Sequence, residues 1–294
     1  MAVYSGPRTP FSALKDGSTG SFWSPRVLSS LWQDTSGTIP AVVDSEVKRM
    51  DDLGGLGNHM IAPTGSRLIS GYTYNFKGPI LRKQNLQYYL EFDGDGAGLY
   101  SGQGNGVWPT ANSNNQVGVT LSVAFRTYSS QPSLPSSGLS GTWLGSDSIG
   151  NYGGVWWFGL RLSVEIMFYA IVRNAENTAW ITQWEEGNRY SYLASSEWLD
   201  RDIIYTASGG LDNATHSGKE WIYGESTLDY SGVAFSNTTE LPVPFQNKFA
   251  IGARAPGNDN WIAGRFYGGT MIAKQLSESE RRIVEDFLYT NTFA

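Results

Sequence analysis

The stretch DDLGGLGNHM, residues 51–60, combines two carboxylates, three glycines and one of the two histidines in the chain. Such a set is compatible with a phosphate-binding loop, a metal-binding loop or a turn. A phosphate-binding glycine loop leads directly into a helix, whose first N–H groups face the phosphate. Pro63 and Gly65 disfavour a helix here, and no lysine directly follows the glycines. The sequence therefore predicts a turn, held by side-chain hydrogen bonds of Asp52 and Asn58.

Calcium binding is the second chemistry that these residue types allow. Asp93-Gly94-Asp95-Gly96 offers two carboxylates at positions i and i+2, and Asp51, Asp52 and Asn58 offer further oxygen atoms. Asp and Gly are equally typical of turns with positive φ. No complete set of ligands with calcium-loop spacing is present. We therefore predict no cofactor and assign no metal-binding residue, and we keep a structural calcium ion as an open alternative.

The composition indicates what positions these residues. The chain has 294 residues, of which 40% are hydrophobic and only 16% charged, with 35 glycines and 14% aromatic residues. This mixture is typical of many short strands joined by tight turns. The net charge of -6 argues against nucleic acid or an anionic membrane as a partner. The absence of cysteine excludes disulfides, thiolate metal sites and cysteine nucleophiles.

The N-terminal residues lack the basic start and apolar run of a signal peptide, and no apolar stretch is long enough to span a bilayer. We expect a protein made without an export signal. Residues 1–21 are rich in Gly, Ser, Thr and Pro, and Pro7 and Pro10 disfavour a helix. We therefore expect an extended N-terminal arm over 1–21 and a single domain over 22–294.

Strand patterns recur at short intervals beyond the arm. Residues 117–126 alternate strictly, with Val117, Val119, Leu121, Val123 and Phe125 on one face, which predicts a half-buried strand. Further strands are predicted over 88–92, 154–162, 164–172, 180–183, 203–206, 249–252 and 268–273.

One helix is predicted near the end of the chain, over about 277–289. Ser277 and Glu280 have the spacing of a capping box, and Ile283, Val284, Phe287 and Leu288 form an apolar stripe expected to dock on a sheet edge or at the end of a sandwich. Many strands, one late helix and no strand–helix alternation predict an all-β fold, an antiparallel two-sheet jelly-roll sandwich.

Several motifs, in this order, resemble the phage-encoded concanavalin A-like jelly-roll proteins of the LamG type. At the start, Phe22-Trp23-Ser24-Pro25, Leu31-Trp32-Gln33-Asp34 and the turn Asp52 to His59 match, although Gly54 and Leu56 replace the usual Ser and Asn. The other matching segments are 90–94, 249–254, 266–269 and 276–281. The matches cover both ends of a span from about 22 to 290, and the middle matches only in the rhythm of its strands. The resemblance implies the fold more strongly than a function.

Catalytic residues were sought against the patterns of glycan-cleaving members of this fold. Laminarinase-like proteins carry Glu-x-Asp-x-x-Glu on one strand, because alternation directs both glutamates into the cleft. That spacing is absent: Glu185-Glu186 would face opposite ways, and Asp200-x-Asp202 lacks a third partner. His59 and His216 fall in expected loops, and no Gly-x-Ser-x-Gly elbow precedes a helix. The sequence therefore predicts a protein that is not an enzyme, without catalytic residues.

Aromatic side chains suggest either sugar binding or packing. Adjacent strand residues face opposite sides, so one ring of Trp156-Trp157 is expected to point outward. Trp180, Trp184, Trp198, Trp221 and Trp261 add further rings. Exposed rings serve as platforms for sugars, but they are also favoured at protein interfaces.

The resemblance implies a bacteriophage virion structural protein, located in the virion and made in the host cytoplasm. We expect it to decorate the head or to be mounted on the tail, and to contact other capsid or tail proteins through its arm and aromatic surface, in several copies or as a homo-oligomer. The alternative is an adhesin that binds host surface polysaccharide. A glycan-cleaving enzyme is the third interpretation. Deleting residues 2–20 and measuring incorporation into particles distinguishes an attached protein from a free one.

Overall fold

The structure is a computed structural model of the whole chain. It describes residues 9–69, 72–101, 116–129, 139–147, 155–161, 165–173, 180–183, 200–212, 215–222, 225–234, 248–252 and 261–293. Within these residues, no helix has the length and apolar character needed to cross a membrane.

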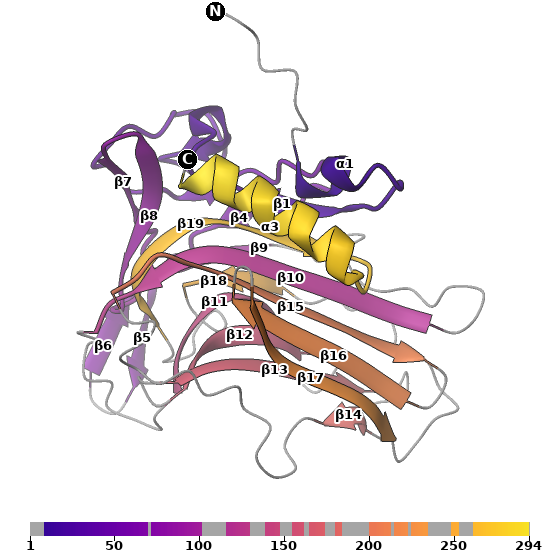
Figure 1. Cartoon of the computed structure of the whole chain (residues 1–294). Coiled ribbons are helices and arrows are strands. Elements are labelled where there is room, and N and C mark those ends of the chain that lie inside the picture. Colours follow the sequence, from indigo (N-terminus) through magenta and orange to yellow (C-terminus); the bar gives the residue numbers. More distant parts are fainter. Residues whose placement is uncertain are drawn as a thin grey trace, which may run out of the picture.

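Two antiparallel sheets face each other and form the body of the molecule (Figure 1). The first sheet has the order β7 (Ile80–Gln84), β8 (Gln87–Asp93), β19 (Ala263–Ile272), β10 (Gln116–Thr127), β15 (Ile203–Asp212), β16 (Thr215–Ile222) and β17 (Glu225–Ala234), and β1 (Gly20–Trp23) also pairs with β19. The second sheet has the order β14 (Trp180–Gln183), β13 (Glu165–Arg173), β12 (Val155–Arg161), β11 (Leu139–Asp147), β18 (Lys248–Ile251), β9 (Leu99–Ser101), β4 (Met60–Ile61), β3 (Arg49–Met50) and β2 (Leu31–Trp32). A separate hairpin joins β5 (Ser66–Ile69) to β6 (Tyr72–Asn75).

The predicted fold class is confirmed: two antiparallel sheets are accompanied by a helix near the C-terminus. Each predicted strand segment lies within an observed strand to within a residue or two at its ends. The main core lies between the sheets. It is formed by residues of the first sheet such as Leu90, Phe125 and Phe266, and by residues of the second sheet such as Met60 and Ile251.

Over residues 120–125, where its side chains are described, strand β10 is buried on both faces, not on one as its alternation predicted. Leu121, Val123 and Phe125 point into the main core, as expected. On the opposite face, Ser122 and Ala124 are completely buried as well, because the helix α3 (Glu278–Thr292) covers the first sheet (Figure 1). Small and hydroxyl-bearing side chains allow a helix to pack close to the sheet. On β10, the face that carries them therefore binds α3, although its polarity suggested contact with solvent.

Helix α3 begins with the predicted capping box. The side chain of Ser277 accepts a hydrogen bond from the backbone of Glu280, and Glu280 returns one to the backbone of Ser277. The helix lies on a sheet face, not at an edge. Three residues of the predicted stripe, Val284, Phe287 and Leu288, are buried, whereas Ile283 is 40% exposed. Arg281 and Glu285 are also buried and form an ion pair with 2.6 Å between Nη1 and Oε2, which hydropathy did not predict.

The prediction of an extended N-terminal arm is wrong for residues 9–21, the part of the arm that the structure describes. Residues Pro10–Leu14 form α1, capped by Thr9, because proline at the first helical position loses no hydrogen bond and its fixed φ suits the helix. The chain then enters β1, which pairs with β19 in register Gly20 to Ile272. Residues 1–8 lie outside the described residues. The division into one domain over 22–294 stays a prediction.

Candidate functional site: a charged face beyond helix α3

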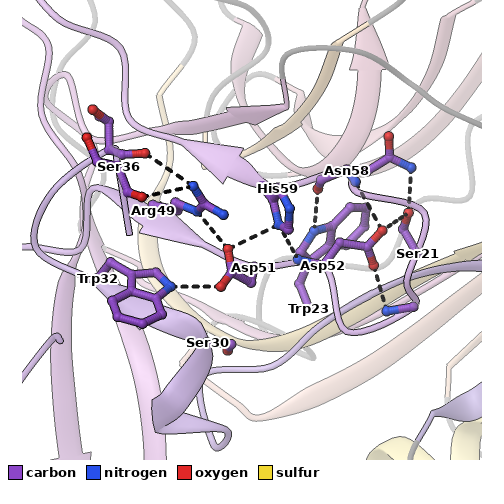
Figure 2. Close-up of polar contacts among 12 residues, drawn as sticks. Ser21, Trp23, Ser30, Trp32, Ser36, Arg49, Asp51, Asp52, Asn58 and His59 are labelled. Carbon is purple, nitrogen blue, oxygen red and sulfur yellow. Dashed lines mark hydrogen bonds and ion pairs between the residues drawn. The ribbon is translucent and has the colours of Figure 1, made fainter. Parts of the chain in front are cut away.

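The predicted turn closes around the buried carboxylate of Asp52 (Figure 2). Ser21 Oγ donates to Oδ2 at 2.9 Å, and the backbone N–H of Phe22 donates to Oδ1 at 3.0 Å. The backbone N–H groups of Gly54 and Asn58 donate at 2.8 and 3.2 Å. Four donors from two distant segments thus converge on one carboxylate, and they join the turn to the start of β1.

Asp51 holds the outer side of the same turn (Figure 2). It accepts hydrogen bonds from Trp32 Nε1 at 2.8 Å and from Arg49 Nε at 2.7 Å. His59 Nδ1 lies 3.1 Å from Asp51 Oδ1 and 3.2 Å from the backbone N of Asp52. A neutral Nδ1 accepts from Asp52, whereas a protonated Nδ1 donates to Asp51. Asp51 and His59 are thus engaged in the turn itself.

The role predicted for this stretch, a turn and not a phosphate loop, is confirmed. Gly55 and Gly57 have φ of +85° and +77°, which favour glycine. Asn58 donates through Nδ2 to Ser21 Oγ at 2.7 Å and accepts from Trp23 Nε1 at 2.9 Å through its backbone oxygen. The polar groups of Asp52 and Asn58 are thus occupied by the protein itself.

The Asp-Gly-Asp-Gly segment also behaves as a turn. Asp93 Oδ1 accepts from the backbone N–H of Asp95 at 2.9 Å, and Oδ2 pairs with Lys77 Nζ at 2.5 Å. Gly94 and Gly96 have positive φ, and a side chain at Gly96 would collide with the backbone of Asn75. No group of three or more His, Cys, Asp or Glu side chains in the described part of the chain is arranged to hold a metal ion. The structural calcium ion, kept as an alternative to the predicted absence of a cofactor, is untested.

The other residues singled out from the sequence are only partly described. Glu185-Glu186, Trp184 and Trp198 lie outside the described residues. Trp156-Trp157, Trp180, His216 and Trp221 lie in strands β12, β14 and β16, for which only the backbone is described. Placing His216 in a loop was therefore wrong. Trp261 is buried and packs on Phe76 with 6.3 Å between ring centroids, so it belongs to the core.

A charged row crosses the outer face of the first sheet beyond the end of α3. Register places Glu91 of β8 opposite Arg265 of β19, and Arg265 opposite Arg126 of β10. Asp202, just before β15, forms an ion pair with Arg126 at 3.0 Å. We call these four residues, together with Tyr128, the charged row. Four elements far apart in sequence contribute to it.

Tyr128 links Glu91 and Arg265, two neighbours in this row. Its hydroxyl donates to Glu91 Oε1 at 3.0 Å and accepts from Arg265 Nε at 3.0 Å. Burial raises the pKa of Tyr128, and burial together with a hydrogen bond to Asp202 raises the pKa of Tyr267. Both phenols therefore remain protonated hydrogen-bond donors at neutral pH.

A second layer of side chains supports the charged row. Arg82 of β7 pairs with Glu91 at 2.8 Å and with Asp44 at 2.6 Å. The guanidinium of Arg265 lies over the ring of Tyr89, 4.5 Å from its centroid. Tyr267 donates to Asp202 at 2.6 Å. Stacking and ion pairing together hold the exposed ends of these side chains in place.

A pocket of about 700 Å³ adjoins the charged row. Glu91 and Tyr128 are shared between the two, and Arg82, Lys77 and Asp93 also line the pocket. The complete lining is Lys77, Gly78, Ile80, Arg82, Glu91, Phe92, Asp93, Ala97, Tyr128 and Ala263. Cations and carboxylates are paired across it, so its wall offers donors and acceptors without a large excess of either charge.

This site has no contiguous signature in the sequence, and none of its residues was predicted to form a site. Its local signal is the period-two pattern of β8, in which Tyr89, Glu91 and Asp93 fall on one face. Nothing in the sequence connects that face with Tyr128 or Arg265, which lie about 40 and 170 residues away and arrive through sheet register.

No protein-family model and no curated protein matches the chain. Among solved structures, two GH54 α-L-arabinofuranosidase structures are similar, at 12% and 13% identity and a TM-score of 0.55, covering 97% of this chain and 65% of theirs. An arabinofuranosidase complexed with arabinofuranosyl-α-1,2-xylobiose is similar at 12% identity and a TM-score of 0.51, covering 85% of this chain and 52% of that one. The chain thus spans less than two thirds of the length of these structures. At this identity, the similarity shows the fold.

These comparisons bear on two predictions, the absence of enzymatic activity and the role in a phage virion. The prediction that the chain is not an enzyme is contradicted, because solved structures that share its fold include arabinofuranosidases. That prediction considered carboxylates at one spacing on one strand, whereas a folded sheet also brings together side chains from separate strands. The resemblance to phage LamG-type proteins correctly predicted a β-sandwich, but these comparisons lend no support to phage origin or to a virion role.

Proposed function

We propose that the chain is a carbohydrate-recognising β-sandwich that binds a glycan at the charged row and its adjoining pocket. The pocket carries the proposal: its volume of about 700 Å³ falls within the range of small-molecule sites, and it opens beside Tyr128. Glu91 and Asp93 offer acceptors, while Arg82 and Lys77 offer donors. A sugar hydroxyl both donates and accepts, so a wall of paired opposite charges suits it.

The fold supports this proposal, since the similar solved structures are arabinofuranosidases and one holds an arabinofuranosyl-xylobiose. Arabinose-substituted xylan oligosaccharides are therefore reasonable first probes. A broad glycan array should accompany them, because the fold alone does not choose a sugar.

Glycan cleavage is the second candidate, and one observation favours it. Glu91 and Asp93 lie two residues apart on β8, so alternation directs both toward the same side, and both line the pocket. Glycoside hydrolysis requires two carboxyl groups, one of them protonated to act as an acid. Here each carboxylate is ion-paired with a cation, Glu91 with Arg82 and Asp93 with Lys77.

The test measures binding and cleavage on the same protein. Calorimetric titration with arabinoxylan oligosaccharides, preceded by a glycan array, should detect a ligand, and Glu91→Gln should weaken its binding about tenfold. Glu278→Gln is the matched control, since Glu278 is exposed on α3 and pairs only with Arg282 in the described structure. Release of reducing sugar shows whether cleavage accompanies binding. Folded protein that binds no glycan on the array or in solution would refute the proposal.

The location in a virion, synthesis in the host cytoplasm and assembly in several copies are untested, and they remain proposals that rest on the sequence resemblance alone. Immunogold labelling of particles from an infected host tests the first of these, because an unlabelled particle would leave the chain without a place in the virion.

A further inference from the structure

Arg265 is a cation of the charged row that forms no ion pair with a carboxylate of the described residues. Arg126 pairs with Asp202, Arg82 with Asp44 and Glu91, and Lys77 with Asp93. For Arg265, no carboxylate of a described residue lies within ion-pair distance. Its cross-strand neighbours are Glu91 on β8, whose carboxylate pairs with Arg82, and Arg126 on β10, which pairs with Asp202. The charges on both sides of Arg265 are therefore already paired with other residues.

The hydrogen-bond partners of Arg265 are neutral groups, and they do not use all of its N–H donors. Nε donates to Tyr128 Oη at 3.0 Å and Nη1 donates to Gln84 Oε1 at 2.6 Å. The phenol of Tyr267 is the third neutral partner. A guanidinium has five N–H donors, so about two remain for a ligand. An oxyanion, such as a carboxylate or a tetrahedral sulfate, can accept from two guanidinium donors at once.

Arg265 is also held in position before any ligand arrives. Its guanidinium stacks on Tyr89 at 4.5 Å, while Gln84 and Tyr128 fix two of its nitrogens. A donor that is already ordered loses little conformational entropy when it binds, so more of the interaction energy contributes to affinity.

We propose that the ligand is an acidic glycan, whose carboxylate or sulfate group pairs with Arg265 while its sugar ring occupies the adjoining pocket beside Tyr128. This inference rests on the proposed function, and it names the class of glycan. Arg265 does not line the pocket itself, but its hydrogen-bond partner Tyr128 does, so the guanidinium lies next to the pocket. Arg265 is then the residue that selects acidic over neutral sugars.

The test compares a uronic acid with its own neutral ester and adds a sulfated glycan as a second source of negative charge. Wild-type protein is titrated with oligogalacturonides, with their methyl esters and with sulfated galactan oligosaccharides, at low salt and at about 150 mM salt. The acid or the sulfated form should bind about tenfold more tightly than the neutral ester, and added salt should reduce the difference. The form that binds more tightly identifies the source of the anion.

Two variants assign the effect to the guanidinium. Arg265→Gln should abolish the preference for the acidic form, and Arg265→Lys should keep a charge but lose paired donation, with an intermediate result. Arg282→Gln, on the exposed side of α3, should change nothing. The comparison of acid and ester needs no variant, so it stands even where Arg265→Gln fails to fold.

The possible failures are distinct. Equal affinity of the wild type for acid, sulfate and ester overturns the acidic-glycan inference and leaves glycan binding intact. A preference for acid that Arg265→Gln retains in folded protein also overturns it, because another cation then selects the ligand. Binding of no sugar at all refutes the proposed function itself.

Discussion

Replacing Asp52 by alanine should destabilise the protein more than any other single change in the 51–60 turn. The carboxylate is 7% exposed and accepts four hydrogen bonds, from Ser21 Oγ and from the backbone N–H groups of Phe22, Gly54 and Asn58. Removing it leaves these donors without their acceptor in a region that water reaches poorly.

The expected loss of unfolding free energy follows from those four donors. A buried donor that loses its partner costs about 1–3 kcal/mol, and bonds to a charged acceptor are at the upper end. Relaxation of the turn and entry of one or two water molecules offset part of this cost. We expect a loss of about 4–6 kcal/mol, a large fraction of the roughly 5–15 kcal/mol that stabilises a typical domain.

Urea unfolding followed by tryptophan fluorescence measures this change. The matched control is Asp51→Ala, since Asp51 is its chain neighbour but its side chain is 23% exposed and its partners, Trp32 and Arg49, are accessible to water. The control should cost about 1–2 kcal/mol. A loss below 1 kcal/mol for Asp52→Ala, or no larger than that of Asp51→Ala, would show that the four contacts do not organise the turn.

Two further changes test the docking of α3 and of the N-terminal segment. Glu285→Leu should cost about 3–5 kcal/mol because it strands the buried charge of Arg281, whereas combining it with Arg281→Met should recover most of the loss; additive losses in urea unfolding would argue against the pair. Burial raises the pKa of Asp16, but hydrogen bonds from Lys274 and Ser18 outweigh burial and hold that pKa well below 3.8. The stabilisation by Asp16 is therefore present above its unfolded pKa and is lost as pH falls through the folded value, so Asp16→Asn should lower stability at pH 7 and flatten its decline between about pH 5 and pH 2. Parallel pH profiles of the two proteins would contradict this.

Much of the fold was predictable because its signals are local. The alternation over 117–126 is imposed by the period of a strand, and the capping box at Ser277 is imposed by the unpaired N–H groups of a helix start. The turn at Asp52 was also predictable, because glycines with positive φ and a carboxylate acceptor are requirements of the turn itself. Each of these features depends on residues within a few positions of one another.

Predictions that depended on solvent exposure were less successful. Ser122 and Ala124 looked solvent-facing, and Arg281 and Glu285 looked like the polar side of the helix, yet all four are buried. Burial depends on which element covers a face, and α3 reaches β10 from about 160 residues further along the chain. Hydropathy describes a residue without its neighbours, so it cannot anticipate such a cover.

The sequence by itself determined the secondary structure, the sandwich class and the turn at 51–60, because steric periods and caps act over short distances. Only the tertiary structure decided which face α3 covers and which side chains form the charged row. Glu91, Arg126, Tyr128, Asp202 and Arg265 meet because antiparallel register aligns β8, β19, β10 and the start of β15. Register is a property of the closed sheet, set by packing against the core, and no short stretch of sequence contains it.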